Sequence, residues 1–446
     1  MSEKPFVSRR NLLKGAGAAL GFPHFVPASA LGKSGRAAPS DRILIGGIGC
    51  GNRGPANMAG FMKHPDAQVV AVCDVRESSR EAAKTAVDKH YDGKGCAAYG
   101  DFRELCARKD LDAVMIASPD HWHVLMALEA IRNREHIYCE KPVGWSFEAG
   151  QVMRKAVQRS GVVFQFGTQQ RSGRDFRFAC ELVRNGRIGL LQTILVGVPP
   201  SLPFPNQPQE PVPAGFDYDR WLGPAPEAPY NYARCRPYTK EGWSVWYHIS
   251  DYCMGFIGNW GIHHLDIAQW GHGTEDTGPV EVQGTGVFPK EGLADCALTW
   301  QVENRFRDGV TLVHMDNATA SRHPLQTPRY APTGILFRGT EGWVYVTRSL
   351  IDAEPKSLLT SAIGPNEIHL EESKDHYRNF LDAVKLRQSA ICPVEVAVRS
   401  DTIAHLDNIA IKLRRKLRWD PARQTFLADD EANRMLRRPM RRPWHL

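Results

Sequence analysis

Residues 43–54 read ILIGGIGCGNRG and predict the fold of the N-terminal part of the chain. The first six residues form an apolar run typical of a buried strand, and the pattern G-x-G-x-x-G follows directly at Gly49, Gly51 and Gly54. Asp74 stands twenty residues after Gly54, at the end of the next apolar run. A strand, a glycine-rich turn, a helix and an acidic residue at this spacing are typical of a dinucleotide-binding site.

The three glycines of this pattern have separate predicted roles. Gly49 permits a tight turn, Gly51 lets the backbone approach a pyrophosphate, and Gly54 lets the helix pack close to the strand. The start of that helix, at Asn52 and Arg53, supplies N–H groups and a dipole that favour phosphate. We therefore expect this turn to bind the phosphates of a dinucleotide.

The acidic residue of the pattern predicts which dinucleotide binds. Asp74 is expected to accept hydrogen bonds from ribose hydroxyls, and it favours NAD over NADP because a carboxylate repels a 2′-phosphate. Arg76 follows two residues later, and it either softens that preference, stacks on the adenine or lies in solvent. NAD is therefore the predicted cofactor, with NADP the less favoured alternative.

The order of strands and helices predicts two fold types in one chain. The first part alternates apolar strands with amphipathic helices, which is typical of the parallel sheet of an α/β Rossmann domain. Strands then dominate, and this predicts an α+β domain with a large open mixed or antiparallel sheet. The predicted boundaries are 41–165 for the NAD-binding Rossmann domain, 166–375 for the α+β substrate and oligomerisation domain, and 376–446 for C-terminal helices and a wrapping tail.

A proline-rich and aromatic insertion is predicted at residues 199–260, within the second domain. Eleven prolines lie between Pro199 and Pro237, which excludes a central strand or a long helix there. Twelve aromatic residues crowd residues 216–260. Two interpretations stay open: the rings bind the C–H faces of a sugar, or they anchor a long loop to the sheet.

The first thirty residues have the pattern of a targeting segment. Residues 8–14, SRRNLLK, contain a twin arginine, a weakly apolar Gly/Ala-rich run follows, and residues 28–30, ASA, form a cleavage-site pattern. We predict a twin-arginine signal peptide over residues 1–30 and a linker over residues 31–40. The predicted location is the periplasm, and the predicted partner is the twin-arginine machinery, which exports folded proteins.

Composition and charge exclude several classes of protein. The chain has 446 residues, of which 42% are hydrophobic and 24% charged, so it can form packed cores. Much of its net charge of +7 comes from basic residues near the two ends, which does not fit the basic face of a nucleic-acid-binding domain. No apolar run beyond the N-terminus is long enough to span a membrane. The scattered histidines, and ten cysteines without a C-x-x-C pair, predict no metal site.

Two further loops are expected at the rim of the parallel sheet, because ligands of such sheets bind beside the carboxyl ends of the strands. The loop ASPDHWH, residues 117–123, follows one predicted strand, and EKP, residues 140–142, follows the next. A lysine in the second loop is suited to bind a substrate hydroxyl or the nicotinamide ribose. The predicted cofactor contacts in these loops are Ser118, Pro119, His121, His123, Glu140 and Lys141.

These motifs, together with residues 258–266, GNWGIHHLD, resemble those of the glucose–fructose oxidoreductase/inositol dehydrogenase/MocA (Gfo/Idh/MocA) family of sugar and polyol oxidoreductases. The resemblance covers nearly all of residues 41–446. The twin-arginine leader, residues 217–224 (DYDRWLGP) and the tryptophan-containing ending are similar to an exported branch of that family.

The resemblance implies a catalytic set of Lys141, His263 and the residue at position 259. The family pattern is Asp-x-x-x-His, whereas this chain has Asn259. An Asp there would orient the imidazole and stabilise its charged form, so with Asn either His263 acts as a base with a lower pKa or catalysis is altered. The candidate substrate contacts are Gln169, Arg171, Trp260, His264 and Asp266.

The activity that the resemblance implies is hydride transfer between a sugar, glycoside or polyol and tightly bound NAD. His263 would accept the hydroxyl proton, and Lys141 would polarise the same oxygen. Two alternatives stay open: an NAD-dependent glycoside hydrolase that oxidises C3 transiently and eliminates the substituent, and a non-catalytic sugar-binding protein that retains the fold. The open sheet of the second domain also offers a surface for a homo-oligomer.

Overall fold

The structure is a computed structural model that describes residue 38 and residues 41–446, apart from 94, 238–243 and 326–331. The predicted signal peptide lies outside the described residues, as does the predicted linker except for residue 38. Residues 43–446 group into one unit by their internal contacts.

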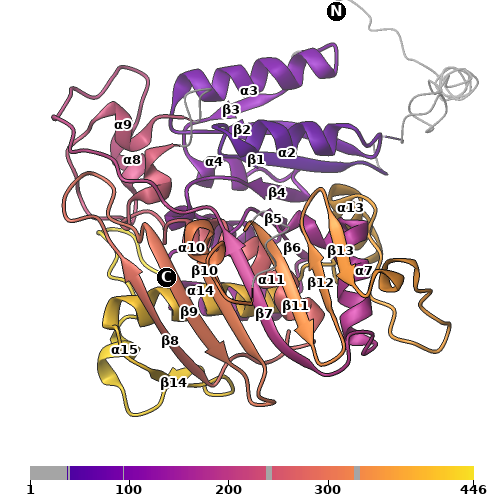
Figure 1. The fold of residues 1–446 in the computed structure, drawn as a ribbon. Coiled ribbons are helices and arrows are strands. Elements are labelled where there is room, and N and C mark those ends of the chain that lie inside the picture. The colour runs from indigo at the N-terminus through magenta and orange to yellow at the C-terminus, as the bar shows by residue number, and fades with distance from the viewer. Residues whose placement is uncertain (1–37, 39–40, 94, 238–243, 326–331) are drawn as a thin grey trace, which may run out of the picture. The chain divides into compact units, whose positions relative to one another are not determined.

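The N-terminal part of this unit contains a parallel six-stranded sheet in the order β3-β2-β1-β4-β5-β6 (Figure 1). The order reverses between β1 and β4, and ligands of such sheets bind in the crevice at that point. The strands are β1 (Ile43–Ile48), β2 (Ala67–Cys73), β3 (Ala97–Tyr99), β4 (Ala113–Ile116), β5 (His136–Cys139) and β6 (Phe164–Phe166).

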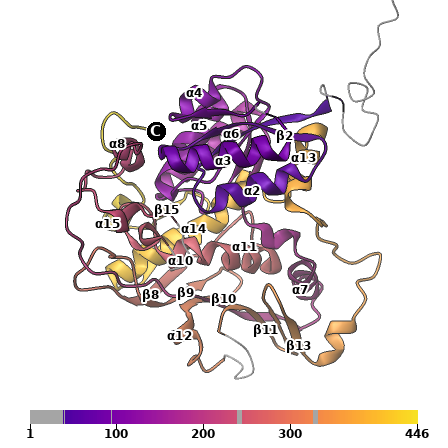
Figure 2. The same cartoon turned by 90° about the horizontal axis from the view of Figure 1, so that it is seen from above.

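Helices cover both faces of this sheet, which is why strands such as β4 and β5 are wholly buried (Figure 2). One face packs against α2 (Arg53–Met62), α3 (Glu77–His90) and α13 (His376–Leu386). The other packs against α4 (Phe102–Cys106), α5 (His123–Arg132) and α6 (Phe147–Ser160). The ends of α6 follow from its sequence, because Ser146 accepts a hydrogen bond from the Ala149 N–H and Gly161 ends the helix at φ 70°.

The second sheet has nine strands in the order β13-β12-β11-β7-β10-β9-β8-β14-β15. Strands β7 and β10 pair in parallel, and the other neighbours pair antiparallel. The predicted combination of a Rossmann sheet and a mixed sheet is therefore confirmed. The strands are β7 (Leu191–Val198), β8 (Glu281–Val287), β9 (Thr299–Arg305), β10 (Thr311–Asp316), β11 (Gly334–Gly339), β12 (Trp343–Val346), β13 (Ile351–Glu354), β14 (Leu417–Asp420) and β15 (Thr425–Phe426).

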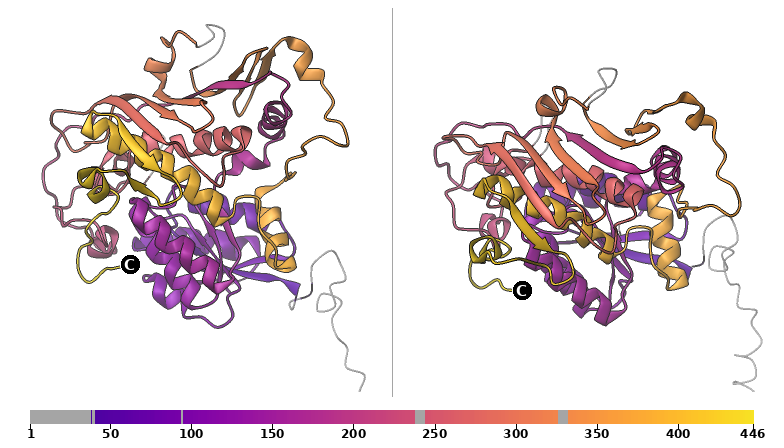
Figure 3. Two further views of the ribbon diagram at one scale, coloured as in Figure 1. Left: turned by 90° about the horizontal axis from the view of Figure 1, so that it is seen from below. Right: turned by 60° about the horizontal axis from the view of Figure 1, so that its bottom comes forward.

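One face of the nine-stranded sheet packs against α7 (Arg174–Arg184), α11 (Gly261–His272) and α14 (Val394–Leu413). Figure 3 shows α14, in yellow, between the two sheets. Its first turns, with Val394 and Val398, pack with the Rossmann core, while Ile403 and Ile409 pack with the second core. This helix therefore joins the two sheets through a continuous apolar contact.

The insertion at residues 199–260 forms short helices and a cluster of aromatic side chains. Rings of Phe216, Tyr218, Trp221, Tyr230 and Tyr252 pack on one another and are buried. The packing supports the interpretation that most rings anchor the segment, while Phe216, Trp221 and Trp260 also line a cavity and sugar binding by them stays a prediction. The helices of the segment are α8 (Tyr218–Leu222), α9 (Tyr232–Cys235), η5 (Val245–His248) and α10 (Phe256–Asn259).

The C-terminal residues return to the Rossmann part of the chain. Strands β14 and β15 extend the second sheet, although the sequence predicted no strand there, because Leu417 gains its strand pairing from Val282 on β8. After α15 (Asp430–Arg434), the Trp444 ring lies 4.7 Å from the Trp122 ring, centroid to centroid. Among the described residues, no helix has the length and apolar character needed to cross a membrane.

Candidate active site

A cavity of about 420 Å³ lies at the carboxyl ends of the parallel strands and extends toward α10 and α11. Gly51 and Asp74 lie at one end of it, and Lys141, His263 and Arg348 lie at the other. The described wall thus contains residues from the Rossmann sheet, from the insertion and from the second sheet.

The glycine turn has the geometry that a phosphate cradle needs. Gly49 has φ 90°, and a Cβ on it would lie 2.6 Å from the Ala117 carbonyl. A Cβ on Gly54 would lie 1.8 Å from the Gly49 oxygen, so only glycine lets α2 approach so closely. Nothing lies within 4 Å of the Cβ position of Gly51, which lines the cavity. These residues therefore fit the pyrophosphate of a dinucleotide.

Asp74 lies beside this turn at the carboxyl end of β2. Its carboxylate accepts hydrogen bonds from the N–H groups of Cys50, at 2.7 Å, and Arg76, at 2.8 Å. Burial raises the pKa of Asp74 against the opposing effect of these two bonds. Arg76 does not simply lie in solvent, as one of its predicted alternatives had it, because its guanidinium stacks 3.9 Å from the Phe216 ring centroid and donates to the Cys235 carbonyl.

The loop at residues 117–123 divides into cavity-facing and buried residues. Ser118 and Pro119 line the cavity, as predicted cofactor contacts should. His121 and His123 do not line it, because His121 bonds the Trp221 carbonyl at 3.0 Å and His123 bonds the carbonyls of Pro142 and Ser118. The two histidines hold neighbouring loops together beneath the cavity surface.

Glu140 connects the second loop to the start of α2. Its carboxylate accepts hydrogen bonds from Arg53 Nε and Asn57 Nδ2, both at 3.0 Å. Burial favours a raised pKa, but Arg53 and Lys141 together lower the pKa of Glu140 below its ordinary value. Glu140 is therefore an ionised support that fixes the backbone from which Lys141 extends.

Lys141 is held by Asn259 across the two halves of the unit. Its Nζ donates to Asn259 Oδ1 at 2.6 Å and to the Asn259 backbone carbonyl at 3.0 Å. The Asn259 amide nitrogen donates in turn to both oxygens of Asp120, at 3.2 and 3.3 Å. Position 259 therefore contacts the lysine and Asp120, whereas the resemblance implied that an Asp there would orient the imidazole of His263.

Asp120 is the ionisable group that sequence reasoning missed in this cluster. Its side chain is 1% exposed, and burial raises its pKa to about 7 although Lys141 opposes that shift. Burial also lowers the pKa of Lys141, with Glu140 and Asp120 opposing. Two features of the sequence together could have revealed it. The loop at the rim of the sheet contains an acidic residue, and position 259 is Asn where the family has Asp.

His263 lies in the wall of the cavity on the first turn of α11. Burial, followed by the charges of Lys141 and Arg348, holds its pKa well below the ordinary value. Its Nδ1 is buried without a hydrogen-bond partner among the described residues, which leaves Nε2 as the nitrogen available to a ligand. The imidazole is therefore neutral at neutral pH and can accept a proton.

The predicted substrate contacts separate into two groups. Gln169 and Trp260 line the cavity. Arg171, His264 and Asp266 do not, and all three are buried. His264 bonds the Gly197 carbonyl through Nδ1 at 3.1 Å, which turns it toward β7.

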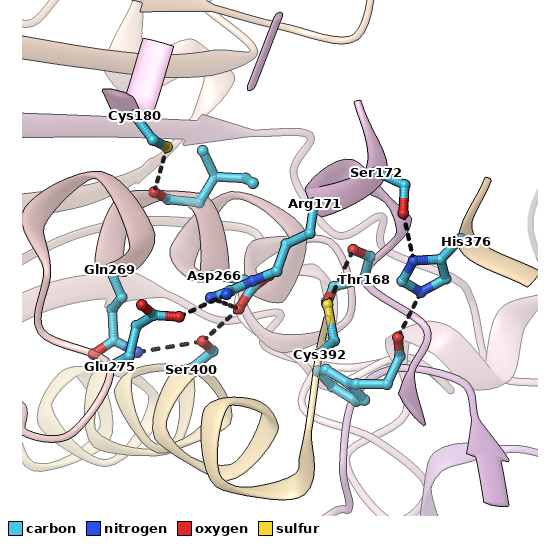
Figure 4. A network of polar contacts seen from close by, with 12 residues as sticks. Thr168, Arg171, Ser172, Cys180, Asp266, Gln269, Glu275, His376, Cys392 and Ser400 are labelled. Atoms are coloured by element: carbon cyan, nitrogen blue, oxygen red, sulfur yellow. Dashed lines mark hydrogen bonds and ion pairs between the residues drawn. The ribbon is translucent and has the colours of Figure 1, made fainter. Parts of the chain in front are cut away.

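Figure 4 shows Arg171 and Asp266 pointing at one another within a buried polar network. Arg171 makes two hydrogen bonds to Asp266, at 2.8 and 2.9 Å, and a third to Glu275. Ser400 of α14 donates to the same Asp266 carboxylate at 2.9 Å. These contacts join η4 (Gln169–Ser172), α11 and α14, so their placement indicates a structural role.

Arg348 is a second cavity residue that the sequence did not reveal. It comes from the turn between β12 and β13, and its guanidinium carbon lies 4.8 Å from the Trp260 ring centroid. No local motif surrounds it. Its position follows from the pairing of strands far from residue 141 in the sequence.

Comparison with known proteins gives two family matches along the chain. Residues 43–168 match the model described as "Oxidoreductase family, NAD-binding Rossmann fold". Residues 205–446 match the Gfo/Idh/MocA model described as "Oxidoreductase family, C-terminal alpha/beta domain". Together the two matches cover both sheets.

Curated relatives are similar over shorter stretches. Myo-inositol 2-dehydrogenase of Thermotoga maritima is 28% identical over 183 residues, which are 41% of this chain and 49% of the relative. A glycosyl hydrolase family 109 protein of Saccharopolyspora erythraea is 36% identical over 107 residues, which are 23% of each chain. The alignments thus span half of these relatives or less.

Solved structures match over nearly their whole length at low sequence identity. The WlbA dehydrogenase from Bordetella pertussis, in complex with NADH and UDP-GlcNAcA, has a TM-score of 0.61 at 18% identity and covers 85% of this chain and 99% of its own. A levoglucosan dehydrogenase, in complex with NADH and levoglucosan, has a TM-score of 0.59 at 15% identity and covers 84% and 99%. At this identity the match shows a shared fold.

Proposed function

The chain belongs to the Gfo/Idh/MocA oxidoreductase family and contains its NAD-binding Rossmann domain, and we propose that it oxidises a hydroxyl group of a sugar, glycoside or polyol. The observation that supports this proposal most directly is one cavity with the glycine turn at one end and Lys141 and His263 at the other. The residues of the turn would bind the pyrophosphate, and Asp74 would bind the ribose. When bound, NAD supplies the hydride acceptor for such an oxidation.

Lys141 is suited to bind and polarise the oxygen of the reacting hydroxyl. Its ammonium has three N–H donors, of which two are taken by Asn259. The third is available to a ligand in the cavity. Because Asn259 fixes the lysine through two bonds, the ammonium is positioned before substrate arrives, which reduces the cost of ordering it.

His263 is suited to accept the proton of that hydroxyl at Nε2. Its lowered pKa keeps the imidazole neutral, so the base is in its active form at neutral pH. The proton would move from the substrate oxygen to Nε2 while Lys141 stabilises the charge that develops on that oxygen. Asp120, through Asn259, supplies the carboxylate that balances the lysine in place of an acidic residue at position 259.

The proposal is tested by identifying the bound nucleotide and by searching for a substrate. Purified protein is denatured, the released nucleotide is identified by chromatography, and intact protein is then mixed with a panel of sugars and polyols. We expect NAD and an increase in the absorbance of reduced nicotinamide with at least one compound. Release of NADP would contradict NAD as the cofactor, and cleavage of aryl glycosides without any net reduction would contradict the dehydrogenase.

A glycoside hydrolase is the second candidate, and its support is the similarity to a glycosyl hydrolase family 109 protein over 107 residues. In such an enzyme the same base and lysine would serve a redox-neutral cycle. Release of the aglycone with unchanged nicotinamide absorbance would favour it. Bound NAD with neither activity would instead favour a sugar-binding protein, for which Asn259 is the supporting residue.

We also propose that residues 1–30 direct export through the twin-arginine pathway to the periplasm, and that NAD stays bound during export. Cell fractionation of the wild type and of an Arg9→Lys/Arg10→Lys variant tests this. The wild type is expected outside the inner membrane with NAD bound, and the variant in the cytoplasm. Equal distribution of the two proteins, or exported protein without nucleotide, would contradict the respective part of the proposal.

A homo-oligomer through the outer face of the nine-stranded sheet is a further proposal. Leu195, Val313, Leu336 and Tyr345 form an apolar cluster on the face opposite α11, each at most 4% exposed in the single chain, and the partly buried Trp343 packs against it. Sedimentation over a range of protein concentrations measures the assembly. A monomer at all concentrations would contradict it.

A further inference from the structure

Arg348 lies at the chemical end of the cavity, on an exposed turn whose backbone is held by hydrogen bonds. The turn that carries it, between β12 and β13, is closed by a hydrogen bond from the Thr347 N–H to the Leu350 carbonyl at 2.8 Å. The N–H groups of Ser349 and Leu350 also donate to Thr347 Oγ1, at 3.2 and 3.1 Å. The arginine therefore extends from an ordered turn, and Trp260 provides the surface beneath its guanidinium.

The acidic groups in the described wall of the cavity are all engaged elsewhere. Asp74 accepts two backbone N–H groups, Glu140 accepts from Arg53 and Asn57, and Asp120 accepts from Asn259. Asp101 pairs with Arg103 and with Arg220. None of these carboxylates is a hydrogen-bond partner of Arg348.

Arg348 is consequently a cation without a hydrogen-bonding anion among the described residues. Partial burial lowers the pKa of Arg348, the positive charge of Arg53 adds to that shift, and the negative charge of Glu140 opposes it, while part of the residue stays exposed to solvent. Lys141 adds a further positive charge at the same end. A guanidinium in this position presents a fork of donors that matches a carboxylate or a phosphate.

We propose that Arg348 binds an oxyanion on the substrate, so that the preferred substrates are acidic sugars, either sugar acids or sugar phosphates. This inference rests on the proposed function for the identity of the site. Trp260 contacts both groups, since its ring centroid lies 4.8 Å from the Arg348 guanidinium carbon and 5.9 Å from the ring centroid of His263. An oxyanion on Arg348 would therefore place the rest of the sugar beside Lys141 and His263.

Binding of an oxyanion at Arg348 also has a consequence for the base. The positive charge of Arg348 is one of the causes that lower the pKa of His263. A bound carboxylate neutralises that charge, so the pKa of His263 rises and the imidazole becomes a stronger base once substrate is present. Acidic substrates would thus prepare the site for proton transfer, whereas neutral sugars would not.

The test compares matched pairs of ligands on protein loaded with NADH. Glucuronate, galacturonate and mannuronate are each paired with the neutral parent sugar, and glucose 6-phosphate is paired with glucose. Equilibrium binding is measured by titration calorimetry for the wild type, Arg348→Gln and Arg348→Lys. The matched control is Arg338→Gln, because Arg338 on β11 bonds the Leu325 carbonyl and does not line the cavity.

The wild type is expected to bind at least one acidic sugar roughly 10- to 100-fold more tightly than its neutral parent, as for a charge-assisted hydrogen bond. Arg348→Gln should abolish that preference, Arg348→Lys should keep part of it, and Arg338→Gln should keep all of it. The uronates and the phosphate distinguish the two sources of the oxyanion. The inference is overturned if no acidic sugar is preferred, if Arg348→Gln keeps the preference, or if this variant loses NADH instead.

This readout separates the inference from the proposed function, because it needs no turnover. If no sugar reduces the bound NAD but Arg348→Gln still removes the acidic preference, the dehydrogenase proposal fails and the anion site stands. If neutral sugars are oxidised at rates that Arg348→Gln leaves unchanged, and acids gain nothing, the dehydrogenase stands and the anion site fails.

Discussion

The two ends of the cavity are built from the sequence in different ways. At the dinucleotide end, Gly49, Asp74 and Arg76 come from neighbouring segments whose strands pair directly. At the chemical end, Lys141, Asn259 and Arg348 come from three distant segments and from both sheets. The first end is therefore encoded as a local motif, and the second exists only after the two sheets have packed together.

This difference has a consequence for substitution. In a local motif each role belongs to one position, as with Gly54, where any Cβ would meet the Gly49 oxygen. In an assembled site a charge can be supplied from another segment. Asp120 places a carboxylate beside Asn259 and thus near Lys141, although position 259 itself carries none.

The largest effect is expected at the chemical end. Lys141→Ala and His263→Ala should each lower turnover by about 10²–10⁴-fold, because each removes a group that handles the reacting proton or oxygen. Both variants should still bind NADH, which fluorescence titration measures. Lys89→Ala and His90→Ala, on the exposed face of α3, serve as matched controls. Turnover near the wild-type value in both cavity variants would remove these residues from the chemistry.

The next effect is expected at the dinucleotide end. Asp74→Ala should weaken NADH binding by roughly 10- to 100-fold, since a charge-assisted hydrogen bond contributes about 1.5–3 kcal/mol. Turnover at saturating cofactor should stay close to that of the wild type. Asp110→Ala is the control, because Asp110 forms an exposed pair with Arg108 away from the cavity. Unchanged affinity in Asp74→Ala would show that this carboxylate does not bind the ribose.

A third prediction concerns the pH dependence of kcat/KM and the carboxylate of Asp120. Asp120 loses its proton as pH rises through about 7, and its negative charge then supports the Lys141 ammonium. The profile of kcat/KM should therefore rise through that range in the wild type and lack this step in Asp120→Asn. Retention of the step in Asp120→Asn would assign it to another group.

The same cluster allows a double-mutant cycle. Asn259→Asp places a second carboxylate against Asp120, so one of the two should remain protonated to a higher pH, and activity at neutral pH should fall. Asp120→Asn/Asn259→Asp restores one carboxylate and one amide, and should recover part of the activity. Equal activities in the single and double variants would show that the two positions act independently.

The smallest effect is expected where the insertion meets the dinucleotide end. Phe216→Leu removes the ring that stacks on Arg76 but keeps an apolar side chain, so NADH should dissociate only a few-fold faster, as for a cation–π contact of about 0.5–1 kcal/mol. Phe204→Leu, which packs on the same cluster without lining the cavity, is the control. Stopped-flow displacement of NADH measures both rates.

The fold was predictable where a pattern is local. The apolar run before Gly49 becomes β1, and the C-terminal helices predicted within residues 376–446 are present as α13 and α14. The segment predicted as a loop at residues 117–123 contains η3 (Asp120–Trp122) and the first residue of α5, and its His121 bonds the Trp221 carbonyl. The short strands β14 and β15 escaped prediction because pairing, not composition, makes them strands.

The site was predictable to the extent that its residues belong to motifs. Lys141 and His263 lie in the cavity, whereas Arg171 and Asp266 satisfy one another in the interior of the second domain. His263 and His264 point in different directions, as neighbours on a helix do, and they face the cavity and β7 respectively. Arg348 has no motif, and only the register of β12 and β13 brings it to the site. The predicted domain boundaries and the roles of the site residues stay predictions.

The central claim is that the dinucleotide end and the chemical end of the cavity act separately. One set of paired measurements tests it most directly. NADH affinity and the single-turnover rate of nicotinamide reduction are measured in the wild type, Asp74→Ala, His263→Ala and the double variant. We predict that Asp74→Ala changes the affinity alone, that His263→Ala changes the rate alone, and that the double variant shows both losses without coupling. A loss of NADH in His263→Ala as large as in Asp74→Ala, or a wild-type reduction rate in His263→Ala, would contradict the account.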